Sequence, residues 1–170
     1  MNERGRGGGS GGHSRADGPG GVVEALLRRS LLVVAALAAA GTAIELAMLR
    51  HWKSGMQLVP WVVLAVLLTA IGLVAMRPSR GSVRVARGVA VAAVLASLVG
   101  MYEHVEANYE SGPLDYRYTE SWASMPEGAR WWAALSKTVG PAPPIAPGVL
   151  SQASLALLLA TLRHESLRRA

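Results

Sequence analysis

Long apolar blocks alternate with polar segments along this chain. The blocks cover residues 31–49, 60–76, 85–102 and 147–162. A helix rises about 1.5 Å per residue, so about 20 apolar residues cross a hydrocarbon core of about 30 Å. The blocks therefore predict an all-α integral membrane protein, a four-helix bundle built from two helix hairpins.

The polar segments divide the chain into a tail and one transmembrane domain. Residues 1–21 are rich in Gly, Ser and Arg and nearly free of apolar residues, which predicts a disordered cytoplasmic tail. Residues 22–170 are predicted to form the four-helix transmembrane domain. Its longest connection, residues 103–146, is predicted to be an extracytoplasmic loop with a short surface helix at 129–137 and a proline-rich end.

The basic residues predict the orientation of the four spans. Five Lys or Arg residues precede the first block, four lie at the connection between the second and third blocks, and three follow the fourth. The other two connections carry two and three. Because cytoplasmic loops are enriched in Lys and Arg, twelve against five predicts a multi-pass protein of the plasma (inner) membrane with both termini in the cytoplasm.

The amino-acid composition and the missing motifs argue against several classes of function. The chain is 51% hydrophobic with a formal net charge of +6, but its basic residues cluster at the ends of the apolar blocks, so no nucleic acid is expected as a partner. Without Cys there are no disulfides or thiolate sites. No phosphate-binding Gly loop, H-E-x-x-H or G-x-S-x-G motif is present, which predicts a protein that is not an enzyme and has no cofactor. Fifteen Arg against two Lys is typical of a GC-rich bacterial coding bias.

The alternative interpretation of the first block is a secretory signal. Arg28 and Arg29 precede it, and residues 38–40 are three alanines that resemble a signal-peptidase site. In that case the mature chain would start at Gly41. The long segment ahead of the arginines and the apolar residues beyond Gly41 favour a membrane span.

Small residues recur at four-residue spacing in the first and third blocks. In the third block the row consists of Gly88, Ala92, Ala96, Gly100, His104 and Asn108. In the first block it consists of Ala35, Ala39, Ala43, Ala47 and His51. Small side chains at this spacing let helices approach closely in lipid. The two rows suggest an internal repeat of helix pairs, although an alanine-rich helix also produces such a row by chance.

The ends of these rows supply a candidate polar cluster at the outer rim. Glu45, His51, His104 and Asn108 are expected to converge there, because the topology places them at one membrane level. A carboxylate near the end of a span also needs a donor, which histidine supplies. The candidate metal ligands are His51, His104 and Glu103, since histidine is the commonest metal ligand in proteins.

Other interpretations of these residues remain open. His104 and Asn108 lie one turn apart and can bond to each other or to backbone carbonyls at a helix end. Glu45 can accept a hydrogen bond from Trp52, Arg50 or a neighbouring helix. Four methionines fall on the outer side and would suit copper, but methionine on membrane helices more often packs.

The polar residues of the hairpins also carry a resemblance. They are Glu45, His51, Gln57, Pro60, His104, Asn108 and Pro141, together with the segment 145–148. In this pattern the chain resembles, between residues 31 and 162, a group of small, uncharacterised bacterial four-span membrane proteins. The resemblance implies four helices with polar groups at the outer rim. It implies no reaction, cofactor or catalytic residue.

The sequence thus leaves two functions open. The first is a non-enzymatic component of the cell envelope, embedded in the lipid bilayer, that binds a membrane-protein partner or forms a homo-oligomer through its outer loop and helix faces. The second is a membrane protein whose outer-rim His/Glu site binds a metal ion, a proton or a small polar ligand, as an accessory to transport or redox reactions. The lack of catalytic motifs favours the first.

Overall fold

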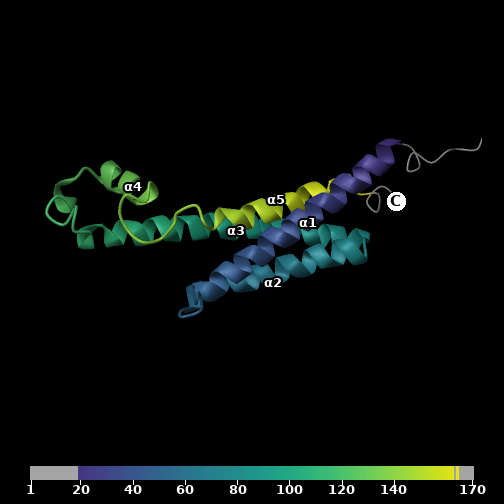
Figure 1. Cartoon of the computed structure of the whole chain (residues 1–170), viewed down its shortest axis with the longest axis horizontal. Helices are drawn as coiled ribbons and strands as arrows, with labels where there is room; N and C mark the ends of the chain where they lie inside the picture. Colours follow the sequence, from purple (N-terminus) through teal and green to yellow (C-terminus); the bar gives the residue numbers. More distant parts are fainter. Residues whose placement is uncertain (1–18, 163, 165–170) are drawn as a thin grey trace, which may run out of the picture.

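The computed structural model of the chain describes residues 19–162 and residue 164, and its regular structure is helical (Figure 1). The elements are α1 (Pro19–Met48), α2 (Gly55–Met76), α3 (Arg80–Ser111), η1 (Gly112–Leu114), η2 (Trp122–Ser124), α4 (Glu127–Leu135) and α5 (Gly148–Thr161), where η marks a short 3₁₀ turn. No residue in the described ranges is in a strand. The all-α prediction is therefore confirmed.

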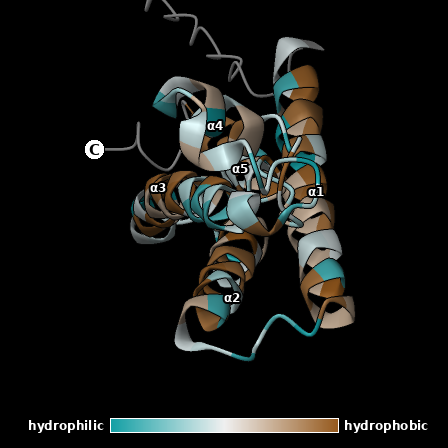
Figure 2. Ribbon diagram, turned by 90° about the vertical axis from the view of Figure 1, so that its left-hand side faces the viewer, coloured by the Kyte–Doolittle hydropathy of each residue, from teal (hydrophilic) through white to brown (hydrophobic). Residues whose placement is uncertain are grey.

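Three of the helices are long and apolar enough to cross a membrane. These stretches are Gly20–Met48, Gly55–Met76 and Arg80–Leu114. They correspond to the first three predicted spans, and Figure 2 shows hydrophobic residues along all three helices. α5 corresponds to the fourth predicted span but has 14 residues, a length of about 21 Å, so it is shorter than a typical span.

Local backbone signals set the two ends of α1. The helix starts at Pro19, a favoured residue for a first helical turn, and so includes the last residues of the predicted tail. Residues 1–18 of that tail lie outside the described residues. At the other end the His51 N–H donates to the Leu46 carbonyl over 2.9 Å, while Arg50 adopts φ 51°. This is a Schellman motif with arginine in place of the usual glycine, and it turns the chain towards α2.

Serine residues cap the next two helices. The Ser54 side chain accepts from a backbone N–H in the first turn of α2, which therefore begins at Gly55 and not at Pro60 as predicted. Pro60 lies inside this helix. Ser79 and Ser82 form a capping box at the start of α3. The predicted starts of these two spans are late because a cap, and not the first apolar residue, decides where a helix begins.

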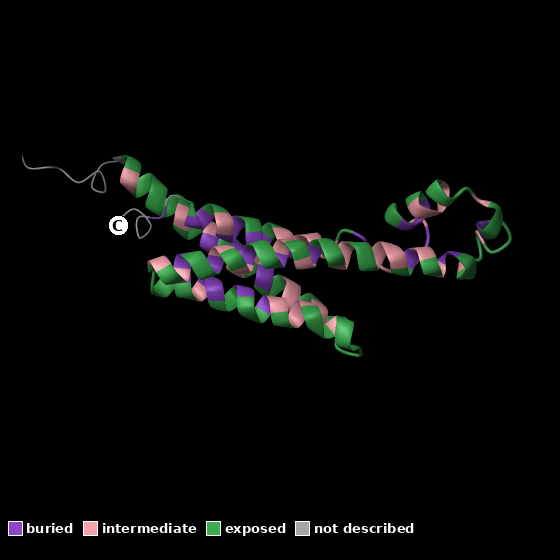
Figure 3. Ribbon diagram, turned by 180° about the vertical axis from the view of Figure 1, so that it is seen from behind, coloured by how far each residue is buried: buried purple, intermediate pink, exposed green. Residues whose placement is uncertain are grey.

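α5 connects the long helices. It packs against both α1 and α3, and α2 packs against the same two helices (Figure 1). The buried residues of α5 are Leu150, Ala153, Ser154, Ala156, Leu157, Ala160 and Thr161. Figure 3 shows buried positions where these helices meet and exposed positions on their outward faces. Those outward faces are themselves apolar, which is typical of helices in a membrane.

The buried face of α3 follows a spacing that mostly alternates between three and four residues. Its members are Val83, Ala86, Ala90, Ala93, Ser97 and Asn108, with the half-buried Gly100 and His104 between them. Positions about 3.5 residues apart stay close to one helix face, whereas a strict four-residue row turns by about 40° per step. The predicted four-residue row therefore does not form a contact face, and its members Gly88 and Ala92 are exposed.

The first and third helices do not pack along their small-residue rows. α2 and α5 lie between them, and in the part of the chain that the structure describes no extensive contact joins α1 to α3. The prediction that these two helices approach each other closely is wrong, because the small side chains of α5, such as Ala153, occupy the space between them. Ala35 and Ala39 are buried while Gly88 and Ala92 are exposed, so the two rows have unlike environments.

Two arginines fix the last turn of α5. The Arg28 Nε donates to the Ala160 carbonyl over 3.0 Å, and the Arg87 Nη2 donates to the Thr161 carbonyl. Carbonyls at a helix C-terminus have no partner within the helix, and the negative end of the helix dipole favours a cation there. Because Arg28 belongs to α1 and Arg87 to α3, these bonds join three helices at one end.

Ala90→Leu tests the contact face of α3, with Ala92→Leu as a matched control on the same helix. Ala90 is 0% exposed and Ala92 is exposed. A larger side chain in a packed interface costs about 1–3 kcal/mol, whereas the same change on an exposed face stays within about 0.5 kcal/mol. We expect Ala90→Leu alone to lower the midpoint of thermal unfolding, measured by circular dichroism in detergent micelles. Equal shifts in the two variants would contradict this contact face.

Candidate functional site

α3 extends beyond the other long helices and carries a small lobe at its end (Figure 1). We call residues 105–139 the distal lobe; they comprise the last turns of α3, both 3₁₀ turns and α4. Residues 103–111 are helical, so the predicted outer loop begins as a continuation of α3. α4 matches the short helix predicted at 129–137, shifted by two residues towards the N-terminus.

The distal lobe has a small core of aromatic side chains. Trp122 is 4% exposed and meets Tyr109 edge-on, with ring centroids 5.5 Å apart. Trp131 of α4 stacks on Tyr109 at 4.5 Å. Gly112 permits this packing, because a Cβ there would overlap the Trp122 ring. Aromatic pairs contribute roughly 0.5–1.5 kcal/mol each beyond their burial, so these contacts fix α4 against α3.

Asn108 is the polar centre of the connection between the distal lobe and the long helices. Its side chain is 0% exposed. Nδ2 donates to the carbonyls of Ala134 (3.1 Å) and Ala142 (2.7 Å), and Oδ1 accepts from the Ala142 N–H (2.9 Å). Gly140, with φ 77°, lies against this amide, and a Cβ there would overlap Oδ1. Both Nδ2 hydrogens and one acceptor site are used, which satisfies the amide in the interior.

His104 holds the segment that leads into α5, residues 140–147, which we call the proline strap. The His104 Nδ1 donates to the Pro143 carbonyl over 2.8 Å. Because a carbonyl only accepts, Nδ1 of the His104 ring carries a proton. Further along α3, the Ser97 hydroxyl donates to the Pro147 carbonyl. Side chains of α3 therefore hydrogen-bond to the proline strap at two of its carbonyls.

The predicted pair His104 and Asn108 thus bonds to backbone carbonyls, which is one of the alternatives that the sequence left open. The two side chains do not bond to each other. Their shared role is to hold irregular backbone against α3, because buried peptide groups without a helix or sheet need side-chain partners.

His51 lies in the loop between α1 and α2, half-buried beside Trp61, whose Nε1 donates to the His51 carbonyl over 2.7 Å. Burial lowers the pKa of His51 below its usual value of 6.5, and the positive charge of His104 lowers it further. The structure therefore brings these two predicted site residues, from different hairpins, within electrostatic range of each other.

The carboxylates of the predicted site, Glu45 and Glu103, form no hydrogen bond or ion pair with this histidine pair within the described residues. Glu45 is on an exposed face of α1, and within the described residues its carboxylate has no hydrogen bond or ion pair, including to Trp52 or Arg50. Glu103 is exposed on α3. In the described part of the chain no three His, Asp or Glu side chains are placed to hold a metal ion, so the predicted ligands do not assemble.

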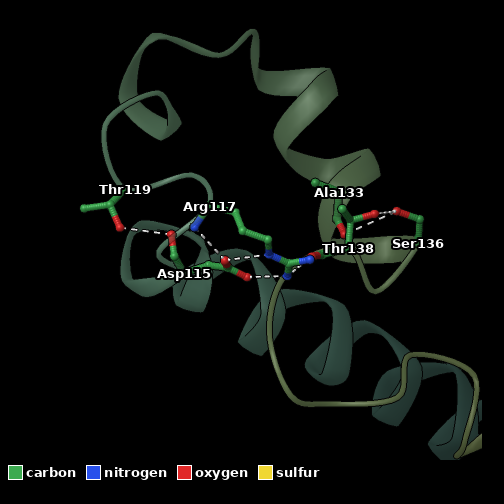
Figure 4. Close-up of polar contacts among 6 residues, drawn as sticks. All are labelled: Asp115, Arg117, Thr119, Ala133, Ser136 and Thr138. Atoms are coloured by element: carbon green, nitrogen blue, oxygen red, sulfur yellow. Dashed lines mark hydrogen bonds and ion pairs between the residues drawn. The ribbon is translucent and has the colours of Figure 1, made fainter.

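An ion pair that the sequence analysis missed joins two segments of the distal lobe. It is formed by Asp115 and Arg117, which we call the clamp. The Arg117 Nε and Nη2 donate to the two carboxylate oxygens of Asp115 over 2.9 and 2.7 Å, and Nη2 also donates to the Thr138 carbonyl after α4 (Figure 4). The hydrogen bonds from Arg117 lower the pKa of Asp115. Between the two clamped residues Tyr116 projects outward, 89% exposed, next to Leu114, which is 85% exposed.

The sequence carries a usable signal for this clamp and none for the partners of Asn108. Asp115 stands two residues before Arg117, a spacing that allows a local ion pair around one turn of loop. Asn108 bonds to main-chain carbonyls, which are present at every position. No residue pattern distinguishes such partners.

Fold and site together define a class: a helical protein with three helices long and apolar enough to cross a membrane and a clamped lobe at the end of one of them. No protein-family model, curated protein or solved structure matches the chain.

Gly140→Ala should loosen the connection between the proline strap and the distal lobe. Alanine at φ 77° adds strain of about 1–2 kcal/mol, and displacing the Asn108 amide exposes buried polar groups worth about 1–3 kcal/mol. Gly128→Ala is the control, because nothing lies within 4 Å of the added carbon. Hydrogen exchange of the backbone amides in residues 105–147 should accelerate in Gly140→Ala only. Unchanged exchange in that variant would contradict the role of Asn108.

The histidine pair predicts loss of stability on acidification. A histidine whose folded-state pKa lies below 6.5 binds fewer protons folded than unfolded, so the free energy of unfolding falls as the pH drops through 6.5 towards the folded pKa. His104→Gln removes one cause of the shift, so the pKa of His51 should return towards 6.5 and the pH dependence should weaken. NMR titration of the His51 ring measures the first effect, and thermal unfolding across this window measures the second. A His51 pKa unaffected by His104→Gln would refute the interaction.

Proposed function

We propose that the protein is an integral component of the plasma (inner) membrane with both termini in the cytoplasm. The three long apolar helices support a membrane location. The orientation is supported by the arginines gathered at one end of these helices. Arg28 and Arg87 bind the last turn of α5 there, and Arg29, Arg77 and Arg84 are exposed near the same helix ends. Cytoplasmic ends of spans are enriched in such residues.

In this proposal α5 is the fourth span of a four-helix bundle despite its length. α5 packs against α1 and α3, and the proline strap continues its path along α3 (Figure 1). Non-helical backbone is tolerated at membrane depth where protein covers it and its peptide groups have partners. The bonds from Ser97 to Pro147 and from His104 to Pro143 supply such partners.

The protein acts, in this proposal, as a non-enzymatic component that binds another envelope protein through its distal lobe. The observation that carries it is the pair Leu114 and Tyr116, 85% and 89% exposed and presented by the clamp between Asp115 and Arg117. Exposed apolar side chains on a rigid support are typical of contact sites, because little conformational entropy is lost when a partner binds. Tyrosine is among the residues that dominate such contacts.

The charges around this pair favour a partner with a basic rim. Arg117 is neutralised by its ion pair with Asp115. The exposed carboxylates on the same end of the molecule are Glu103, Glu110, Glu120 and Glu127. An acidic surface around an apolar centre attracts a complementary basic surface and speeds its association.

Proton binding at the histidine pair is a second candidate function. The observation that bears on it is that a charge on His104, which bonds to Pro143 of the proline strap, opposes protonation of His51 in the loop between α1 and α2 and so lowers its pKa. When both rings are protonated, their like charges repel the loop between α1 and α2 from α3. A metal ion is not proposed at this place, because the predicted ligands do not assemble.

Reporter fusions test the orientation. Ser79 precedes α3 and Ser121 lies in the distal lobe, so the two positions flank a proposed span. A reporter that is active only outside the cytoplasm should be active when fused at Ser121 and inactive at Ser79. The reverse pattern would overturn the orientation. Activity at both positions would contradict the crossing of α3.

A photo-crosslinking residue at position 116 tests the proposed docking role, with exposed position 119 in the same loop as the control. Irradiation of cells should give a discrete heavier adduct from position 116 only. Leu114→Asp should reduce this adduct, since loss of a central apolar contact of about 2 kcal/mol weakens binding roughly thirtyfold. The absence of an adduct from position 116, or equal adducts from both positions, would refute docking at this pair.

A further inference from the structure

α4 has one covered face and one open face. Ala133 and Ala134 face the core of the distal lobe and are 6% and 0% exposed. On the other face Trp132 and Leu135 are 68% and 49% exposed. These two residues lie three positions apart and therefore side by side on the helix. Within the described residues, nothing covers this open apolar face of α4.

The contacts of α3 determine how far α4 lies, along the axis of α3, from the loop between α1 and α2. His104 is close enough to His51 of that loop for its charge to act there, and Figure 1 shows α3 continuing beyond the loop. Asn108 is one turn, about 6 Å, further along α3 and bonds to the Ala134 carbonyl in the last turn of α4. α4 therefore ends about one helical turn beyond the loop that joins the first two long helices. Figure 1 shows α4 beside the far part of α3, beyond the end of α5.

This position of α4 is close to the membrane–water boundary that Trp52 and Trp61 indicate. Trp52 lies in the loop after α1 and Trp61 in the second turn of α2, with ring centroids 6.2 Å apart, and tryptophan is enriched where a membrane meets water. Ile145 of the proline strap is 74% exposed and follows closely after Pro143, the residue that His104 holds. Exposed apolar side chains are thus found near this level in the loop after α1, at Trp52, and in the proline strap, at Ile145.

We propose that α4 is an interfacial helix whose Trp132 and Leu135 insert between the headgroups and acyl chains of the outer leaflet. The proposal rests on the membrane location proposed above. Its chemistry fits a lipid surface, because an indole combines an apolar ring with one N–H donor for the wet headgroup layer. Lys137, exposed at the end of α4, offers an ammonium group to lipid phosphates.

α4 then anchors the distal lobe to the bilayer while Leu114 and Tyr116 stay in water. The end of α3 at Ser111 lies seven residues beyond His104, about 10 Å further from the membrane. With α3 on one side and lipid on the other, the distal lobe has two attachments and therefore one orientation above the membrane. This orientation turns the exposed pair towards proteins that approach from outside.

Single cysteines in the full-length protein test this proposal, because the chain has no Cys of its own. Trp132→Cys reports on α4, Tyr116→Cys on the aqueous end of the distal lobe, and Leu98→Cys on the exposed apolar face of α3. Each variant is labelled with the fluorophore NBD and reconstituted into vesicles of phosphatidylcholine and phosphatidylglycerol. We expect lipids with a nitroxide high on the acyl chain to quench the label at position 132. Aqueous iodide should quench it roughly threefold less than the label at position 116.

Two results would overturn the proposal. Iodide quenching at position 132 equal to that at position 116, without quenching by lipid, would show that the face is open to water and free for a protein partner. Protection from iodide without quenching by lipid would show a contact between copies of the chain. Leu98→Cys separates this inference from the proposed function. Lipid quenching at position 98 alone rejects only the interfacial helix, whereas its absence at position 98 rejects the membrane location itself.

Discussion

The contact between one face of α3 and the chain from residue 140 to residue 161 is the interaction on which the rest of the structure depends. Small residues along α3 let this segment approach closely, as at Gly100, where an added Cβ would lie 3.2 Å from the Pro147 ring. In lipid, such close packing and hydrogen bonds drive helix association, because apolar burial gives no preference for protein over acyl chains. The same face continues past α5 to Asn108, so it positions the distal lobe as well.

The polar side chains along this contact bond to main-chain carbonyls. Arg28 and Arg87 bind the last turn of α5, and Ser97, His104 and Asn108 bind the proline strap and α4. The proline strap explains why donors are needed. Four of its eight residues are prolines, which have a carbonyl but no N–H, so the segment presents mostly acceptors. A row of donors on α3 complements it, which is the physical reason that an irregular segment can lie beside apolar helices.

The distal lobe is rigid for different reasons. Stacking of Tyr109 with Trp131, burial of Trp122 and the ion pair between Asp115 and Arg117 each restrain a different part of it. A rigid support lowers the entropy cost of binding, so it suits a contact site better than a mobile loop does. The histidine pair lies outside the distal lobe, and there a charge on His104 of α3 disfavours protonation of His51 in the loop after α1.

Much of the outline followed from the sequence alone. A bilayer about 30 Å thick demands long apolar helices, so three membrane-length helices and the all-α class could be predicted from the apolar blocks. His104 and Asn108 also stood out, because polar residues at the end of an apolar helix need partners. Their roles did not follow, since their partners lie 39 and 34 positions away and are carbonyls without a side-chain signature.

Only the tertiary structure decided which faces meet. A row of small residues on α3 fits several helix faces equally well, and the insertion of α5 between α1 and α3 selected the one that contains Ala90 and left Ala92 exposed. The same insertion kept the first and third helices apart. Local sequence sets what a helix can bury, but the face that it does bury depends on the neighbour that packs there, and that neighbour comes from more than fifty residues further along the chain.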